Sequence, residues 1–149
     1  MKTIIKLMFI SLVALAIISC DNKNEPTLET TLSDFGYISG DTSMVLTGSS
    51  QKNIRLRWEK SVAENSTLVF YKVQFSDNQD DFTDPTHEII PGRLGSNAFV
   101  DITDSVLNII AEKSSIRQLT TKKMYWRVMA SNGVNAKTIS GGAKYMEVT

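Results

Sequence analysis

Histidine is the side chain best suited to general base catalysis near neutral pH, and His87 is the only histidine in the 149-residue sequence. A serine hydrolase would use it as the base, beside Asp84 or Glu88 and one of many serines. The Gly-x-Ser-x-Gly signature of an exposed serine nucleophile is absent, since Gly95-Ser96 lacks the rest of it. We therefore interpret His87 as an exposed loop residue and predict a protein that is not an enzyme.

The acidic segment 77–88 carries oxygen ligands of the kind that calcium prefers. Five of them fall at positions 1, 3, 5, 7 and 12 of an EF-hand loop, namely Asp77, Gln79, Asp81, Thr83 and Glu88. Phe82 stands where that loop requires glycine for its sharp turn, so the signature fails. A looser site would use Asp77, Asp80, Asp81 and Asp84. We favour a solvated acidic loop, without a metal or any other cofactor.

The first nineteen residues have the composition of an export signal. Lys2 and Lys6 precede an apolar run from Leu7 to Ile18 that only Ser11 interrupts. Twelve residues are too few to cross a bilayer core of about 30 Å as a helix, which needs roughly 20. We therefore predict that residues 1–19 are a signal peptide and not a membrane-spanning anchor.

Cys20 is the only cysteine, so it cannot form an internal disulfide. The sequence Ile17-Ile18-Ser19-Cys20 resembles the lipobox of bacterial lipoproteins, which implies that Cys20 is acylated and becomes the first mature residue. Acyl chains on Cys20 would hold the protein to a membrane, because each buried CH₂ contributes about 0.8 kcal/mol. The alternative is an ordinary signal peptide followed by an incidental cysteine. Segment 20–31 is polar, contains Pro26, and is predicted to be a tether.

The charge of the mature chain excludes one class of partner. Removing residues 1–19 takes away two lysines and no acidic residue, so 16 basic residues become 14, against 16 acidic ones. A nearly neutral chain has no electrostatic footprint for nucleic acid. The remaining 130 residues are enough to bury one core without disulfides.

The elements that must position these residues are organised around segment 123–131. Met124, Trp126, Val128 and Ala130 share one parity there, which predicts a central strand with one buried face. The opposite parity contains Lys123, Arg127 and Ser131. Asn132-Gly133 ends it with a turn. Similar patterns and turn signals predict further strands at 32–37, 44–47, 54–58, 69–75, 87–90, 98–102, 135–140 and 143–148. Trp58 and Trp126 are expected to meet in the core, with a hydrogen-bond partner for each indole N–H.

One helix is predicted, from about residue 104 to 113. Thr103 suits the N-cap, Asp104 complements the positive N-terminus, and Ile102 and Leu107 stand at hydrophobic-staple positions. The apolar stripe at 106–111 would cover one end of the fold. The fold class predicted is therefore all-β, an antiparallel β-sandwich with one short helix before the central strand.

Three of these segments resemble known domains. Leu56-Arg57-Trp58, Tyr71-Lys72-Val73-Gln74-Phe75 and 126–133 are similar to strands B, C and F of immunoglobulin and fibronectin type III folds. A closer resemblance, over residues 20–149, is to the N-terminal domain of SusE-like outer-membrane lipoproteins of Bacteroidetes. It rests on Trp58, the segment 75–82 with its acidic loop, the 107–111 helix and Trp126-Arg127-Val128. Met124 stands where type III domains often have a tyrosine, so a tyrosine-corner hydrogen bond is not expected unless Tyr125 substitutes.

The resemblance implies a cell-surface lipoprotein, anchored in the outer membrane by lipid and associated with polysaccharide utilisation. Residues 32–149 would form its immunoglobulin-like domain, a spacer or docking module beside a SusC/SusD-like transporter. Starch binding does not carry over, because the modules that bind starch in such proteins have no counterpart here. Parity along the strands predicts four outward aromatics as an interaction surface, Tyr125, Phe70, Phe99 and Tyr145. The rival functions are a small glycan-binding module that uses these aromatics and an adhesin or other assembly subunit.

Overall fold

The central strand has the alternation that the sequence predicts. The structure is a computed structural model that describes residues 30–39, 42–44, 53–117 and 120–148. In it, β7 (Lys122–Ser131) buries Met124, Trp126, Val128 and Ala130 completely, and the residues between them are half-buried or exposed. The next residue, Asn132, begins the turn to β8, as predicted.

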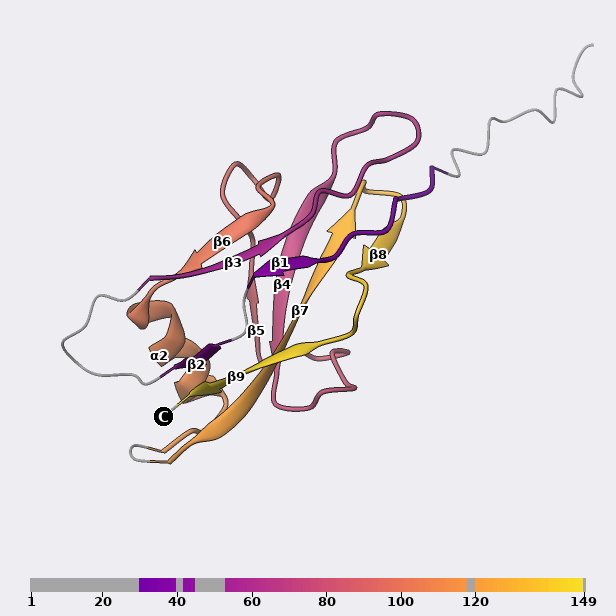
Figure 1. Ribbon diagram of the computed structural model, residues 1–149. Helices are drawn as coiled ribbons and strands as arrows, with labels where there is room; N and C mark the ends of the chain where they lie inside the picture. Colours follow the sequence, from indigo (N-terminus) through magenta and orange to yellow (C-terminus); the bar gives the residue numbers. More distant parts are fainter. Residues whose placement is uncertain (1–29, 40–41, 45–52, 118–119, 149) are drawn as a thin grey trace, which may run out of the picture.

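Two sheets pack against each other around this strand. Their strands are β1 (Tyr37–Ser39), β2 (Thr42–Met44), β3 (Ile54–Trp58), β4 (Phe70–Ser76), β5 (His87–Ile89), β6 (Phe99–Ile102), β7, β8 (Ala136–Thr138) and β9 (Lys144–Val148). Within the described residues, the smaller sheet has the order β1-β3-β6 and the larger has the order β2-β9-β7-β4-β5, with β8 also paired to β7. Figure 1 shows the smaller sheet lying over the larger one. The predicted all-β sandwich is confirmed.

The first predicted strand, 32–37, is wrong as a continuous element. Leu32 makes one isolated bridge to Ala63, and β1 begins only at the end of the segment. Ser33 and Asp34 both face solvent, so the segment lacks the two-residue period that a strand requires. Its backbone is held instead by the loop between β3 and β4, where the carbonyl of Val62 accepts a 2.9 Å hydrogen bond from the N–H of Ser33.

The edge of the larger sheet also differs from the expectation of antiparallel pairing throughout. β1 pairs antiparallel with β3, but β2 pairs in parallel with β9. The chain therefore passes from the smaller to the larger sheet between β1 and β2. Residues 45–47 of the predicted strand 44–47 lie outside the described residues.

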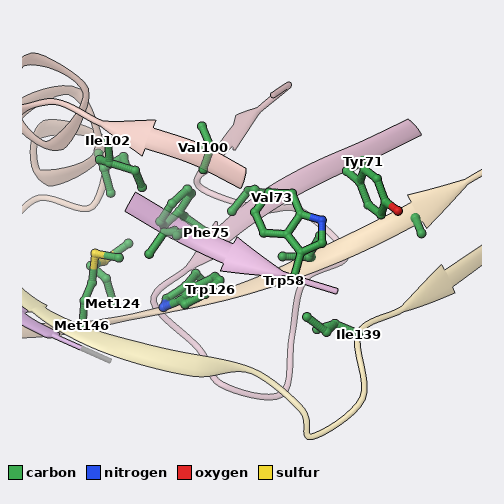
Figure 2. Packing of buried hydrophobic residues seen from close by; sticks show 14 of the residues in the cluster. Trp58, Tyr71, Val73, Phe75, Val100, Ile102, Met124, Trp126, Ile139 and Met146 are labelled. Atoms are coloured by element: carbon green, nitrogen blue, oxygen red, sulfur yellow. The ribbon is translucent and has the colours of Figure 1, made fainter. Parts of the chain in front are cut away.

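The core lies between the sheets, and both tryptophans are buried in it (Figure 2). The ring centres of Trp58 and Tyr71 are 5.6 Å apart. The ring centres of Trp126 and Tyr37 are 5.0 Å apart, in an edge-to-face arrangement. The Tyr71 hydroxyl accepts a 2.8 Å hydrogen bond from the backbone N–H of Ser61. The Tyr71 hydroxyl therefore ties β4 to the loop after β3, and the Tyr37 hydroxyl on β1 donates a 2.8 Å hydrogen bond to the carbonyl of Gly142.

The expected partners of the two indole N–H groups are not found. Neither Trp58 Nε1 nor Trp126 Nε1 has a hydrogen-bond partner among the described residues. An unsatisfied buried donor costs about 1–3 kcal/mol. Burying an indole ring removes about 200 Å² from water, which stabilises the fold by roughly 5 kcal/mol. The ring burial therefore outweighs the lost hydrogen bond, and both tryptophans stay inside.

Helix α2 (Asp104–Lys113) closes one end of the sandwich, as predicted. The Thr103 side chain caps it by accepting a 3.3 Å hydrogen bond from the N–H of Val106. Leu107, Ile110 and Ala111 face the core and are buried. Figure 1 shows α2 at the end of the sandwich opposite to the point where the chain enters at residue 30. We call the end covered by α2, residues 102–114, the helix pole.

Candidate functional site

The outer face of the larger sheet brings together two of the four aromatics predicted as an interaction surface. Tyr125 on β7 is directly opposite Tyr145 on β9, and their ring centres are 6.4 Å apart at an interplanar angle of 62°. The Lys123 ammonium lies 4.5 Å from the centre of the Tyr145 ring. Tyr145 remains 50 % exposed. We call Lys123, Tyr125 and Tyr145 the tyrosine cluster.

The other two predicted aromatics lie elsewhere. Phe70 begins β4, opposite Ser131, at the far end of the same sheet face. Phe99 is on β6 in the smaller sheet, where the Arg55 guanidinium lies 4.7 Å from its ring centre. Parity therefore assigned each aromatic to an outer face, but parity does not tell which sheet a strand joins or how far apart two rows lie.

A polar network lies next to the tyrosine cluster. Gln74 is buried in its middle, where its amide nitrogen donates to Glu88 at 2.7 Å and its oxygen accepts from Arg127 Nε at 2.9 Å. Lys72 forms a 2.9 Å salt bridge with Glu88, and the Arg127 guanidinium lies 4.4 Å from the ring centre of Phe82. Burial alone would raise the pKa of Glu88, but the hydrogen bonds from Gln74 and Lys72 lower it below its ordinary value.

Sequence reasoning missed this network because it depends on register. Glu88, Gln74 and Arg127 form one row across β5, β4 and β7. Each residue is outward by parity, but residues 74 and 127 are far apart in the sequence, and the sequence does not give the register that pairs them. Hydrogen bonds link all three side chains of the row, which makes this part of the outer face rigid.

The acidic loop keeps its carboxylates separate. Asp77 forms a 3.1 Å salt bridge with Lys122. Asp81 accepts a 2.9 Å hydrogen bond from the backbone N–H of Thr83, and this bond lowers the pKa of Asp81. The four candidate calcium ligands, Asp77, Asp80, Asp81 and Asp84, are all exposed. In the part of the chain that the structure describes, no group of three or more His, Cys, Asp or Glu side chains could hold a metal ion.

His87 lies on β5, half-buried, with surroundings that do not suit a catalytic base. Its Nδ1 is 3.4 Å from the Lys113 ammonium. Burial and the charge of Lys113 lower the pKa of His87, against the opposing charge of Glu88. A triad base requires a carboxylate that orients and stabilises the imidazolium, whereas here a cation occupies that position. The Glu88 carboxylate is already bound by Gln74 and Lys72.

The chain enters the described structure at the end opposite the helix pole. We call this end the tether pole and define it by residues 30–33, 59–69, 90–98 and 132–135 (Figure 1). Thr30 is buried there; its hydroxyl accepts from Asn132 Nδ2 at 2.8 Å and its carbonyl accepts from Asn135 Nδ2 at 2.8 Å. The N–H of Ser33 donates to the carbonyl of Val62 at 2.9 Å. These bonds hold the first described residues, from Thr30 to Ser33, against the turn after β7 and the loop after β3.

Asn132 therefore has two functions, only one of which was predicted. Its Oδ1 accepts from the N–H groups of Val134 and Asn135 at 3.1 and 2.8 Å, which forms the expected turn. Its Nδ2 holds Thr30, from the start of the domain. The predicted signal peptide 1–19, Cys20 and tether residues 21–29 lie outside the described residues.

Comparison with known proteins gives one match. The family model of the SusE outer membrane protein matches residues 19–129, which is well over half of the chain. The chain belongs to the SusE outer membrane protein family. No curated protein and no solved structure matches it. The SusE-like character expected from the sequence is thus confirmed, and the family is one of the outer membrane.

The SusE match includes the start of the tether pole but only part of the tyrosine cluster. It includes Cys20, the clamped residues from Thr30 onward and Tyr125, but it ends inside β7, so Tyr145 on β9 lies beyond it. The tyrosine cluster therefore combines two positions inside the matched segment, Lys123 and Tyr125, with one outside it, Tyr145. None of the described helices is long and apolar enough to cross a membrane.

Proposed function

We propose that the protein is a lipid-anchored lipoprotein on the surface of the outer membrane that acts as a non-catalytic spacer or docking module in glycan acquisition. Membership of the SusE outer membrane protein family supports the location. The apolar run that ends at Cys20, inside the matched segment, supports the anchor. In this proposal residues 1–19 are removed, residues 20–31 tether the chain, and residues 32–149 form the immunoglobulin-like domain.

The observation that carries the docking role is the outer face of the larger sheet. Its polar row of Glu88, Gln74 and Arg127 is held rigid by internal hydrogen bonds. The adjoining tyrosine cluster offers aromatic area with a polar edge, the composition that is enriched in protein interfaces. A rigid face of this kind suits a protein partner, and a SusC/SusD-like transporter is the partner that we propose.

Geometry favours docking over glycan stacking. A sugar ring stacks on a free aromatic face, and two neighbouring rings serve one glycan best when they are nearly coplanar. Tyr125 and Tyr145 are inclined at 62°, and the Lys123 ammonium occupies one face of the Tyr145 ring. Phe70 and Phe99 lie too far away to extend the pair into a platform. A glycan-binding module and an adhesin remain the alternative functions.

The lack of catalysis that we propose is supported by the surroundings of His87. Its neighbouring cation, Lys113, works against the imidazolium that a general base must form. Within the residues that the structure describes, the acidic side chains are not gathered into a metal site that could replace it.

Photo-crosslinking in intact cells tests the docking role. A photo-reactive amino acid in place of Tyr125 is expected to crosslink the protein to a larger outer-membrane protein. The same amino acid in place of Phe99, an aromatic of similar burial on the other sheet, is the matched control and is expected to give no such product. Equal crosslinking at both positions, or none at position 125, would contradict the proposal.

Glycan-array binding distinguishes the docking role from the main alternative, a glycan-binding module. A glycan-binding module would bind purified glycans without other proteins, and Tyr125→Ala would abolish that binding while Phe99→Ala would not. Under our proposal neither variant changes glycan binding, and Tyr125→Ala weakens only the association with the outer-membrane partner.

A further inference from the structure

The tether pole exposes most of the large apolar side chains that the fold leaves in water. Nine such side chains are exposed in the described part of the chain, and five of them lie on this pole, namely Val62, Leu68, Ile90, Leu94 and Val134. Three of them are the most exposed of the nine, since Leu94 is 89 %, Leu68 71 % and Val134 69 % exposed. They come from three different loops, so the concentration of apolar side chains belongs to the pole and not to one segment.

Leu94 is held outward by a hydrogen-bonded turn. Arg93, Leu94 and Gly95 all have positive φ angles, of 56°, 56° and 96°, a conformation that is unfavourable for leucine. The N–H of Gly95 donates to the carbonyl of Pro91 at 2.8 Å, and the carbonyl of Gly95 accepts from Tyr71 on β4 at 2.7 Å. The turn thus adopts an unfavourable backbone conformation at the position where an apolar side chain is exposed to solvent. The Leu94 side chain itself gains almost no burial within the domain, which points to a contact outside it.

The charges of the pole exclude an electrostatic partner. Its described loops carry Lys60 and Arg93 against Glu59 and Glu64, so positive and negative side chains balance. The five exposed apolar side chains of the pole are distributed over three loops, 59–69, 90–98 and 132–135. A folded protein partner needs a continuous complementary surface, whereas the headgroup region of a lipid bilayer can accommodate separate side chains.

The position of the tether indicates that the bilayer is what contacts the tether pole. Thr30 is clamped on this pole, and only ten residue steps separate it from Cys20. A chain of that length reaches at most roughly 35 Å when fully extended and about 18 Å on average when flexible. If Cys20 is acylated, as our proposed function requires, the anchor therefore keeps the tether pole, and not the helix pole, beside the membrane.

We propose that the tether pole rests on the bilayer that holds the Cys20 anchor, with Leu94, Leu68 and Val134 inserted into its headgroup region. This inference depends on the anchor in the proposed function and adds an orientation to it. The outer face of the larger sheet then runs away from the membrane and stays accessible to a partner. The contact is apolar, so it does not require anionic lipid and does not weaken with salt.

Depth-dependent fluorescence quenching tests the orientation. The mature acylated protein, which begins at Cys20, is reconstituted in vesicles of phosphatidylethanolamine and phosphatidylglycerol, and in vesicles that also contain lipopolysaccharide. Leu94→Cys and Leu68→Cys each provide one free thiol for an environment-sensitive fluorophore, because Cys20 is blocked by its acyl group. Ile109→Cys on α2 is the matched control, an exposed aliphatic residue at the helix pole. Circular dichroism checks that each variant is folded.

Lipids that carry a quencher on the acyl chain are expected to reduce the fluorescence at positions 94 and 68 several-fold more than at position 109, at low and at high salt. Equal quenching at both poles would overturn the inference, and so would quenching that disappears at high salt. A label at position 94 that is shielded in native outer membranes but not in vesicles would assign the pole to a protein and also overturn it. Flotation with the vesicles separates the two proposals: a protein that floats without selective quenching contradicts only the orientation, and one that does not float contradicts the anchor and both proposals.

Discussion

The two poles of the sandwich differ in the exposure of their large apolar side chains, which are mostly buried at the helix pole and mostly exposed at the tether pole. At the helix pole, Leu107 and Ile110 are completely buried beneath a capped helix. At the tether pole, Leu94 and Leu68 stand in water, whereas the polar Thr30 is buried and hydrogen-bonded. The difference indicates that the helix pole stabilises the fold and that the tether pole keeps its apolar side chains for contacts outside the domain.

A pair of leucine variants is the strongest test of this contrast. Leu107→Ala is expected to lower the free energy of unfolding by about 2–5 kcal/mol, because it removes a fully buried side chain and leaves a cavity. Leu94→Ala is expected to change it by less than about 0.5 kcal/mol, because the side chain has almost no contacts to lose. Urea unfolding of both variants measures the difference, and similar losses would show that the poles are not distinct.

The clamp on Thr30 should contribute an intermediate amount. Asn132→Ala removes the donor to a buried hydroxyl and the acceptor of its own turn, which is expected to cost about 1–2 kcal/mol. Hydrogen exchange at Ser33 should accelerate as the entering segment loosens. Asn65→Ala is the control, because Asn65 caps an exposed turn by bonding only to Thr67. If Asn65→Ala costs as much, the tether clamp has no special role.

The helix cap gives a smaller effect at the other pole. Thr103→Ala removes the hydroxyl that accepts from the N–H of Val106, and it should lower the unfolding free energy by about 1 kcal/mol. Thr103→Ser keeps the hydroxyl and should recover most of that loss. Thermal denaturation of the two variants compares them directly, and equal melting temperatures would show that the capping hydroxyl does not stabilise the fold.

The smallest effect concerns pH at His87. Burial and Lys113 lower its pKa below the ordinary value of 6.5, so acid protonates the unfolded state first. Stability at this site is therefore complete above about pH 6.5 and is lost as the pH falls toward the lower folded pKa. The loss should stay under about 1 kcal/mol, since the ring is only partly buried. His87→Gln should flatten the unfolding free energy between pH 7 and pH 5, and an unchanged slope would assign it to other groups.

The elements predicted correctly from the sequence are those specified by short-range patterns. The alternation at 123–131 and the cap, staple and stripe at 102–111 each lie within about three turns or one strand. The failures involve partners far away in the chain. The parallel pairing of β2, the row from Glu88 to Arg127 and the bond from Asn132 to Thr30 depend on register and topology, which periodicity does not contain.

The candidate surfaces follow the same division. Parity correctly placed Tyr125 and Tyr145 on an outer face, but their contact required the β7–β9 register. The exposed Leu94 had no signal at all, because an isolated leucine near glycine and proline resembles any loop residue. Its importance comes from its left-handed backbone and its position beside Thr30, which only the structure gives.

The central claim is that a folded domain is held at its tether pole by lipid on Cys20. Cell fractionation of the full-length protein and of Cys20→Ser tests it most directly, with globomycin treatment to block signal removal at an acylated cysteine. The wild-type protein should be found in the outer membrane and accumulate unprocessed with globomycin, and the variant should leave the membrane fraction. An outer-membrane Cys20→Ser protein, with processing that globomycin does not affect, would contradict the account.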